Sequence, residues 1–264
     1  EQIFERLRYA GQRAETAMFS ATHGINTHKG LVFASAILCG ALGKVHAGKS
    51  LPLPAEEVLS ECRKLGSCSL GDLAKLSRHQ NKLSPASSID MNSQDSRGSM
   101  PMDTKNHPPQ AEPSALSNGE RIFSAYGIQG ARGEAAAGFP SAVRIGLPAL
   151  KKWLAACFSL NDAAAMALLT LISEVDDTNM VHRGGPELAK KSKEQAKHLL
   201  SAVTNDSFKE ILSSLDEQYI AMHLSPGGCA DLLAVSLMFH FLETCGMISP
   251  VISSSLPHRR PPSM

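Results

Sequence analysis

The sequence has few aromatic residues and almost no net charge. Aromatic residues make up 5% of the 264 residues, with a single tryptophan, which leaves little material for a surface that stacks nucleic-acid bases. Lysine and arginine number 26 against 25 for aspartate and glutamate, so the formal net charge of +1 gives no general attraction to nucleic acid or to an acidic membrane. Any anionic ligand must therefore be held by a local arrangement of residues.

The chain also lacks paired cysteine motifs and an uninterrupted apolar span. No Cys-x-x-Cys pair occurs among its six cysteines, and most of them lie in apolar segments, as expected for reduced thiols of a protein core. No charged-then-apolar leader with a small-residue cleavage site is present, and the longest apolar runs are broken before they reach the length of a membrane span. We therefore expect a cytoplasmic protein.

Alternating strand patterns are absent as well, whereas helical patterns are frequent. Hydrophobic residues make up 43% of the chain, as in a globular protein with a core. Apolar residues spaced three and four apart predict a first helix with the stripe Ile3, Leu7, Ala10, Ala14 and Met18. Further helices are predicted over residues 31–42, 54–64 with Gly66 as a stop, 148–158, 161–175, 186–203, 207–222 with the capping pattern Ser207-x-x-Glu210, and 232–242.

The expected fold class is all-α, a single-domain multi-helix bundle. Residues 31–42, 163–175 and 232–242 are apolar on most faces and are predicted to form its central layer. Residues 84–117 are rich in proline, serine and other polar residues and are predicted to be a disordered insertion. The helical domain then has a first part over 1–83 and a second part over 118–252, followed by a flexible tail over 253–264.

The most informative motif lies between two predicted helices. Asp176 and Asp177 follow an apolar helix, where the macrodipole is already negative and a bound Mg²⁺ would supply the missing cation. Arg183, Gly184 and Gly185 then precede a helix that starts with proline, whose free N–H groups are suited to a phosphate. These features are typical of a site for a metal-bound polyphosphate, but a Gly-rich turn with solvated charges would give the same pattern.

Two more helix entrances have a similar design. Before residues 31–42, Asn26 or Thr27 is a candidate N-cap, and Lys29 next to Gly30 places a cation in the first turn, where it opposes the dipole unless it faces an anion. The entrance to residues 232–242 combines a proline start with exposed backbone and one acid: Ser225, Gly227, Gly228 and Asp231. Three such entrances suggest one shared anionic ligand.

These segments resemble the motif series of triphosphoribosyl-dephospho-CoA synthases. The resemblance is carried, in chain order, by Arg8-x-x-Gly11-x-x-Ala14-Glu15-x-x-Met18, Gly24-Ile25-Asn26-Thr27-His28-Lys29-Gly30, Gly130-Ala131-Arg132-Gly133-Glu134-Ala135-Ala136-x-Gly138-Phe139-Pro140, the segment 176–185, and Ser225-Pro226-Gly227-Gly228-x-Ala230-Asp231-Leu232-Leu233-Ala234. It covers most of the chain outside the insertion and the tail. It implies an enzyme that joins ATP to 3'-dephospho-CoA with release of adenine, making the prosthetic-group precursor for the acyl carrier subunit of citrate lyase or malonate decarboxylase.

In the implied reaction, the 2'-hydroxyl of dephospho-CoA attacks the anomeric carbon of the ATP ribose while the triphosphate stays on that sugar. We predict that Asp176 and Asp177 coordinate Mg²⁺ and that Lys29, Arg132 and Arg183 bind the triphosphate. The nucleotide site is predicted to include further residues around them: Asn26, Gly30, Gly184, Gly185, Ser225, Gly227, Gly228 and Asp231.

Proton transfer needs a base and an acid. Glu15 and Glu134 are candidates for the base that takes the 2'-hydroxyl proton or for a group that stabilises the cationic sugar. His28 and His182 are candidates for protonating the leaving adenine, because histidine transfers protons near neutral pH. Each of the four could instead be a surface charge, a salt-bridge partner or a helix cap.

Two rival functions remain at this stage. An all-α, metal-dependent nucleotide pyrophosphohydrolase or prenyl-diphosphate enzyme also presents carboxylates from helices, but Met180 stands where a prenyl-type Asp-Asp-x-x-Asp motif needs an acid. A non-catalytic module that binds nucleotide or a protein partner is the second, because the chain has no counterpart of the family's Thr-Pro-Lys-Pro-Gly-Leu-Val-Asp type motif. Besides ATP and 3'-dephospho-CoA, the phosphoribosyl-dephospho-CoA transferase and the acyl carrier protein are candidate partners; nucleic acid and membrane are not.

Overall fold

The computed structural model describes residues 2–80, 118–204 and 207–252, and the predicted insertion and tail lie outside these ranges. The described residues are mainly helical, which confirms the all-α fold class. Their only strand-like pairing is a single bridge between Leu53 and Ile248. The elements are α1 (Gln2–Ala21), α2 (Lys29–His46), α3 (Ala55–Gln80), α4 (Asn118–Tyr126), α5 (Gly130–Ala136), the π-helical segment η1 (Ala142–Gly146), α6 (Leu147–Ala155), α7 (Leu160–Glu174), α8 (Thr178–Ala202), α9 (Phe208–Ala221) and α10 (Gly227–Thr244).

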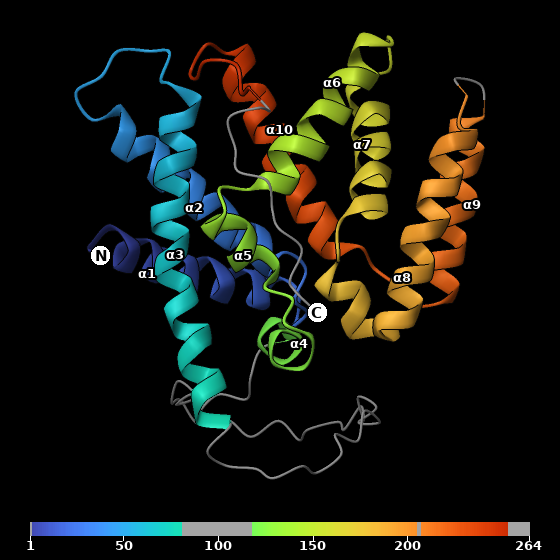
Figure 1. Ribbon diagram of the computed structural model, residues 1–264, viewed down its shortest axis with the longest axis horizontal. Helices are drawn as coiled ribbons and strands as arrows, with labels where there is room; N and C mark the ends of the chain where they lie inside the picture. The colour runs from blue at the N-terminus through green and yellow to red at the C-terminus, as the bar shows by residue number, and fades with distance from the viewer. Residues whose placement is uncertain (1, 81–117, 205–206, 253–264) are drawn as a thin grey trace.

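Helix α10 runs through the middle of the molecule (Figure 1). It contacts α2 and α5 on one side and η1, α6, α7 and α8 on the other, and its Val235 and Phe239 are fully buried. The predicted central layer is therefore present, with α10 between α2 and α7. By length and apolar composition alone α2 could also cross a membrane, a test that core helices pass as well; here it packs against α1, α3 and α10.

Helix α3 continues well beyond the predicted stop at Gly66. The helix reaches Gln80 because Gly66 serves close packing and not termination. A Cβ placed on Gly66 would overlap the backbone of Ala135 in α5, and α3 packs directly against α5. Glycine here removes the side chain that would keep the two helices apart, at a modest cost in helix propensity.

Helix α8 consists of a short first part that begins at Thr178 and a longer second part that begins at the predicted start, Pro186. Asp177 is its N-cap, and the helix is kinked at Gly185, whose φ of 75° is in the left-handed region. Proline at the next position lacks the N–H that a continuous helix would use, so the kink has a local cause. The helix start predicted at Pro186 is therefore present after the kink, and the sequence missed the additional turns that begin at Thr178, directly after the aspartate pair.

Two smaller predictions are also corrected. In α1 the buried positions are Phe4 and Met18, whereas Ile3 is exposed. At the start of α9, the hydroxyl of Ser207 accepts the N–H of Thr204 and does not cap the helix. Both differences arise because tertiary or loop contacts outweigh a local pattern.

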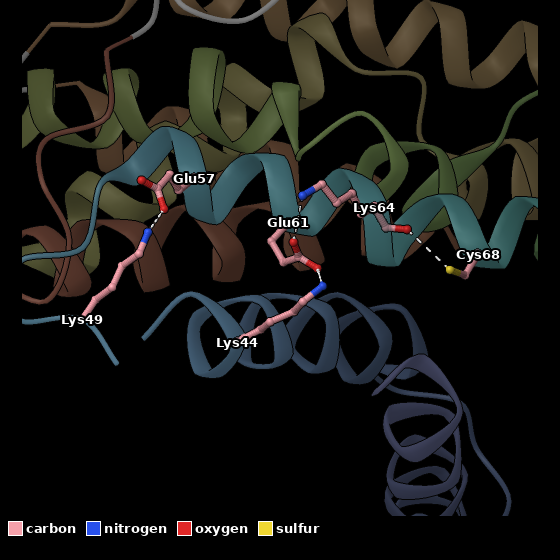
Figure 2. A network of polar contacts seen from close by, with 6 residues as sticks. All are labelled: Lys44, Lys49, Glu57, Glu61, Lys64 and Cys68. Carbon is pink, nitrogen blue, oxygen red and sulfur yellow. Dashed lines mark hydrogen bonds and ion pairs between the residues drawn. The ribbon is translucent and has the colours of Figure 1, made fainter. Parts of the chain in front are cut away.

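A buried glutamate joins α2 to α3. Glu61 on α3 is 5% exposed and contacts Lys44 of α2 and Lys64 one turn along its own helix (Figure 2). Burial alone would raise the pKa of Glu61, but the hydrogen bonds and positive charges of the two lysines outweigh it and hold this pKa below its usual value. The ion pair helps fix α2, whose other end contributes to the candidate site.

Candidate active site

The first turns of four helices meet in a closed ring. A Cβ on Gly30 in α2 would lie 3.9 Å from Cβ of Ala131 in α5, and one on Gly130 of α5 would lie 3.2 Å from Cγ2 of Thr178 in α8. The start of α8 contacts the start of α10 through Asp177 and Cys229, and Asp231 of α10 contacts Gly30 of α2. We call this arrangement the N-terminal ring. The contact at Gly130 is tight and its φ of 55° also favours glycine, whereas 3.9 Å between Gly30 and Ala131 is ordinary van der Waals contact.

Asp177 joins α8 to α10 within the ring. Its Oδ1 accepts the N–H groups of Asn179 and Met180, and its Oδ2 accepts the N–H of Cys229 at 2.7 Å. The residue is 4% exposed, and a Cβ on Gly228 would lie 3.2 Å from its carboxylate. Burial raises the pKa of Asp177, against the opposing effect of the three N–H groups. One carboxylate thus satisfies donors at the entrances of two helices.

Asp231 closes the ring between α10 and α2. Its carboxylate accepts the backbone N–H of Leu31 in the first turn of α2 and lies against Gly30. Burial and the negative charge of Asp177 raise the pKa of Asp231 to about 7. Two carboxylates are therefore held close together at the ring, where a cation would lower the energy of both.

Lys29 and Glu15 contact each other at the entrance to α2. Their side chains form an ion pair of 2.9 Å between α2 and α1, and both are partly exposed. The N-cap of α2 is His28 and not Asn26 or Thr27 as predicted, although Oδ1 of Asn26 accepts the N–H of Lys29 at 3.1 Å. The sequence assigned Lys29 and Glu15 to different tasks, whereas the structure brings them together beside the ring.

Three glycine N–H groups in the ring have no partner among the described residues. They belong to Gly30, Gly227 and Gly228, and Asp231 is the neighbouring acid. Free N–H groups at helix starts favour an anion, whereas a carboxylate beside them favours a cation. Both preferences are met by a polyphosphate that carries a divalent metal ion.

A dedicated metal cage is not part of this arrangement. No group of three or more His, Cys, Asp or Glu side chains with metal-binding geometry occurs in the part of the chain that the structure describes. Mg²⁺ does not need such a cage, because it usually takes one or two carboxylates, waters and substrate phosphates. The donor set around Asp231 therefore fits Mg²⁺ that arrives with a nucleotide.

Basic side chains extend from the ring along α4, α5 and α8. Arg132 in the first turn of α5 donates to Glu120 of α4 at 3.2 Å, and its Nη1 is buried without a hydrogen-bond partner. Partial burial and the charges of Arg121 and Arg183 lower the pKa of His182. Figure 1 shows α4, which carries Arg121, close to the beginning of α8.

Asp176, the other acid of the aspartate pair, faces away from the ring. Asp176 has a side chain that is 72% exposed, and it accepts a hydrogen bond from Lys193 of α8 at 2.8 Å. Its neighbour Asp177 is buried and bound by backbone groups. The pair is therefore split between solvent and interior, so the two carboxylates do not form a single bidentate pair at the ring.

Several other candidates have contacts that explain them structurally. Glu134 is 5% exposed, and its two oxygens accept the N–H and the hydroxyl of Ser141. His28 is exposed and bonds the Thr27 hydroxyl. A Cβ on Gly184 would meet Leu224 and Leu188, so this glycine serves packing. Ser225 is half-buried just before Pro226, the N-cap of α10.

Sequence reasoning missed Arg121 and the double capping role of Asp177. The pattern Asp-Thr-Asn-Met is compatible with an N-cap and could have located the start of α8. The bond from Cys229 to Asp177 joins residues far apart in the chain, and no local pattern reports it. Arg121 had no motif of its own, and only the packing of α4 on α8 places it near His182.

Comparison with known proteins gives a consistent family. The sequence matches the model of the ATP:dephospho-CoA triphosphoribosyl transferase family over residues 1–248. It is 38% identical over 242 residues to a probable 2-(5''-triphosphoribosyl)-3'-dephosphocoenzyme-A synthase of Streptococcus equi subsp. zooepidemicus, with 91% of this chain and 74% of that protein covered. Proteins with the same name from Streptococcus mutans (34% over 244 residues, 92% and 74% covered) and Streptococcus pyogenes serotype M49 (36% over 251 residues, 91% and 74% covered) are also similar. No solved structure matches the chain.

Proposed function

The chain belongs to the ATP:dephospho-CoA triphosphoribosyl transferase family, and we propose that its N-terminal ring is where ATP and 3'-dephospho-CoA react. The observation that supports this location is that the ring combines unpartnered backbone N–H groups with the carboxylate of Asp231. Polyphosphate oxygens would bind the N–H groups of Gly30, Gly227 and Gly228. Lys29 and Arg132 lie in the first turns of α2 and α5 and would add positive charge around the same group.

Mg²⁺ would bind between the polyphosphate and Asp231. The ion would neutralise charge on the phosphates and relieve the repulsion between Asp231 and Asp177. Asp177 itself would keep its structural role, because three backbone N–H groups already hold its oxygens. Asp176, which the sequence also nominates, is directed to Lys193 and would not contact the ion.

The chemistry is a substitution at the anomeric carbon of the ATP ribose. A bond forms between this carbon and the 2'-oxygen of dephospho-CoA, and the bond to the adenine nitrogen breaks. The 2'-hydroxyl proton goes to a carboxylate, for which Glu15 beside Lys29 is better placed than the buried Glu134. Positive charge that develops on the sugar is stabilised by the nearby acids of the ring.

The leaving adenine needs a proton donor. The lowered pKa of His182 favours the neutral imidazole near pH 7, which makes this histidine a weaker acid catalyst. His28 is exposed at the entrance of α2 and is the better candidate. The product would serve as the prosthetic-group precursor of the citrate lyase or malonate decarboxylase acyl carrier subunit, which makes that subunit and its transferase the expected protein partners.

Adenine release tests this function directly. The wild-type chain is incubated with Mg²⁺ and ATP, with and without 3'-dephospho-CoA, while adenine and the coupled product are followed by chromatography and mass spectrometry. Adenine should appear only with both substrates. Pyrophosphate from ATP alone would favour a hydrolase, and binding without any product would favour a non-catalytic module.

A matched pair of variants links the reaction to the ring. Asp231→Asn should lose most adenine release, because the acid beside the polyphosphate is neutralised without a change in volume. Asp216→Asn is the control, since Asp216 is exposed on α9. Equal activity of both variants would place the reaction elsewhere.

A further inference from the structure

Arg121, His182 and Arg183 form a basic cluster next to the N-terminal ring. Arg121 belongs to α4 and the other two to α8, and these helices pack against each other. All three side chains are exposed. The two guanidinium groups lie near enough to the imidazole for their charges to act on it. The cluster is therefore a concentration of positive charge on the surface beside the ring.

Two acids next to this cluster in sequence are engaged elsewhere. Glu120, adjacent to Arg121 in sequence, bonds Arg132 at 3.2 Å. Asp176, at the start of α8, bonds Lys193 at 2.8 Å. Neither Arg121 nor Arg183 forms an ion pair with any residue in the ranges that the structure describes. Positive charges gathered without counter-charges are suited to an external anion.

The cluster continues the ring along one face of α8. His182 follows Thr178 by four residues, so both lie on the same side of the helix about one turn, or roughly 5.4 Å, apart. Thr178 is the residue that meets Gly130 in the ring. An anion bound at the cluster would therefore be a close neighbour of a polyphosphate bound at the ring.

The two substrates present two such anions. In ATP the triphosphate is attached to the 5'-carbon of the ribose that is attacked. In dephospho-CoA a diphosphate is attached to the 5'-carbon of the ribose whose 2'-hydroxyl attacks. When the two riboses meet, both anionic groups come close together, and their repulsion requires separate cationic sites.

We propose that Arg121, His182 and Arg183 bind the diphosphate of 3'-dephospho-CoA while the ring binds the triphosphate of ATP. This inference rests on the proposed function and assigns Arg183 and His182 to the second substrate, in contrast to the roles that the sequence suggested. Arginine is suited to the task because its planar fork binds two phosphate oxygens at once.

Kinetics of an exposed arginine variant test the assignment. Arg121→Gln and wild type are compared by adenine release, first with dephospho-CoA varied at saturating Mg-ATP and then with ATP varied. Arg121→Gln should raise the KM for dephospho-CoA by about tenfold or more, as expected for one charge-assisted phosphate contact, with the KM for ATP and kcat within about twofold. Arg121→Lys should recover part of the loss because it keeps the charge.

Arg6→Gln is the matched control, since Arg6 is an exposed arginine near the start of α1. Its kinetic constants should equal those of wild type. A rise in the KM for ATP alone in Arg121→Gln would show that the cluster holds the triphosphate. No change in either constant would show that it is only solvated. Either result overturns the assignment.

Calorimetric binding separates this inference from the proposed reaction. Wild type and Arg121→Gln are titrated with dephospho-CoA and with pantetheine, which carries no phosphate. Only dephospho-CoA should bind more weakly to the variant, again by about tenfold. If wild type releases no adenine yet shows this Arg121-dependent binding, the reaction is wrong and the site stands. If wild type releases adenine and both proteins bind dephospho-CoA equally, the site is wrong and the reaction stands.

Discussion

The carboxylate of Asp231 occupies the space that a side chain at Gly30 would need. A Cβ on Gly30 would overlap Oδ2 of Asp231, and the same carboxylate accepts the N–H of Leu31. The entrance of α2 and the first turns of α10 are thus built around one acid. That acid is also close to Asp177, so the geometry that joins the helices keeps two negative charges together.

Asp231→Asn should make the ligand-free protein more stable at neutral pH. The folded-state pKa of Asp231, about 7, is above its ordinary value of 3.8, so the folded state binds the proton more tightly than the unfolded state. This contribution is fully present below about pH 4 and is lost as the pH rises to about 7. The melting temperature of the variant minus that of wild type should therefore grow by a few degrees between pH 4 and 7 and then level off.

Melting curves in the absence of nucleotide and Mg²⁺ measure this difference. Asparagine can still accept the N–H of Leu31, so the comparison isolates the charge. A difference that stays constant from pH 4 to 8 would contradict the raised pKa.

Asp177→Asn should destabilise the fold, although the sequence alone suggested a purely functional effect. The amide of asparagine has one accepting oxygen, so a buried N–H of α8 or α10 would lose its acceptor. The expected loss is about 1–3 kcal/mol of unfolding free energy, measured by urea denaturation. Asp176→Asn is the adjacent control and should change stability by less than about 0.5 kcal/mol, because its side chain is 72% exposed. Equal stability of the two variants would argue against the capping role.

The difference between Asp176 and Asp177 shows which features a local sequence pattern can predict. The apolar segments and the three helix entrances are readable because each depends on residues close together in the chain. The bond from Cys229 to Asp177 and the pair of Lys29 with Glu15 depend on how α10 meets α8 and how α1 meets α2. The periodicity of apolar residues does not indicate such contacts. The sequence therefore could not predict that Asp177 is buried while Asp176 is exposed.

A glycine in a sequence can mark either a helix end or a close contact between helices, because the second role also depends on contacts that are distant in the chain. Two glycines of α3 test this second role directly. Gly66→Ala should destabilise the protein by about 1–3 kcal/mol, because its new methyl group would overlap the backbone of Ala135. Gly71→Ala, in the same helix with nothing within 4 Å of the added carbon, should stabilise it by about 0.5–1 kcal/mol through higher helix propensity. Thermal unfolding of both variants should therefore shift in opposite directions. A rise in both would mean that α5 does not pack closely on α3.

Lys29→Gln tests whether the entrance of α2 faces a phosphate. In the ligand-free protein Lys29 pairs with Glu15 near the surface, and such a pair contributes only about 0–1 kcal/mol, so its loss should change the melting temperature little. A phosphate contact would add about 1.5–3 kcal/mol that only the wild type has in the presence of Mg-ATP. Ligand at the same concentration should then raise the melting temperature of the variant less than that of wild type. Lys49→Gln removes a comparable surface pair with Glu57, in the loop that follows the opposite end of α2, and should retain the full rise. If Lys29→Gln retains the full rise as well, Lys29 faces only Glu15 and water, and the triphosphate must be held by the backbone of the ring and Arg132 without it.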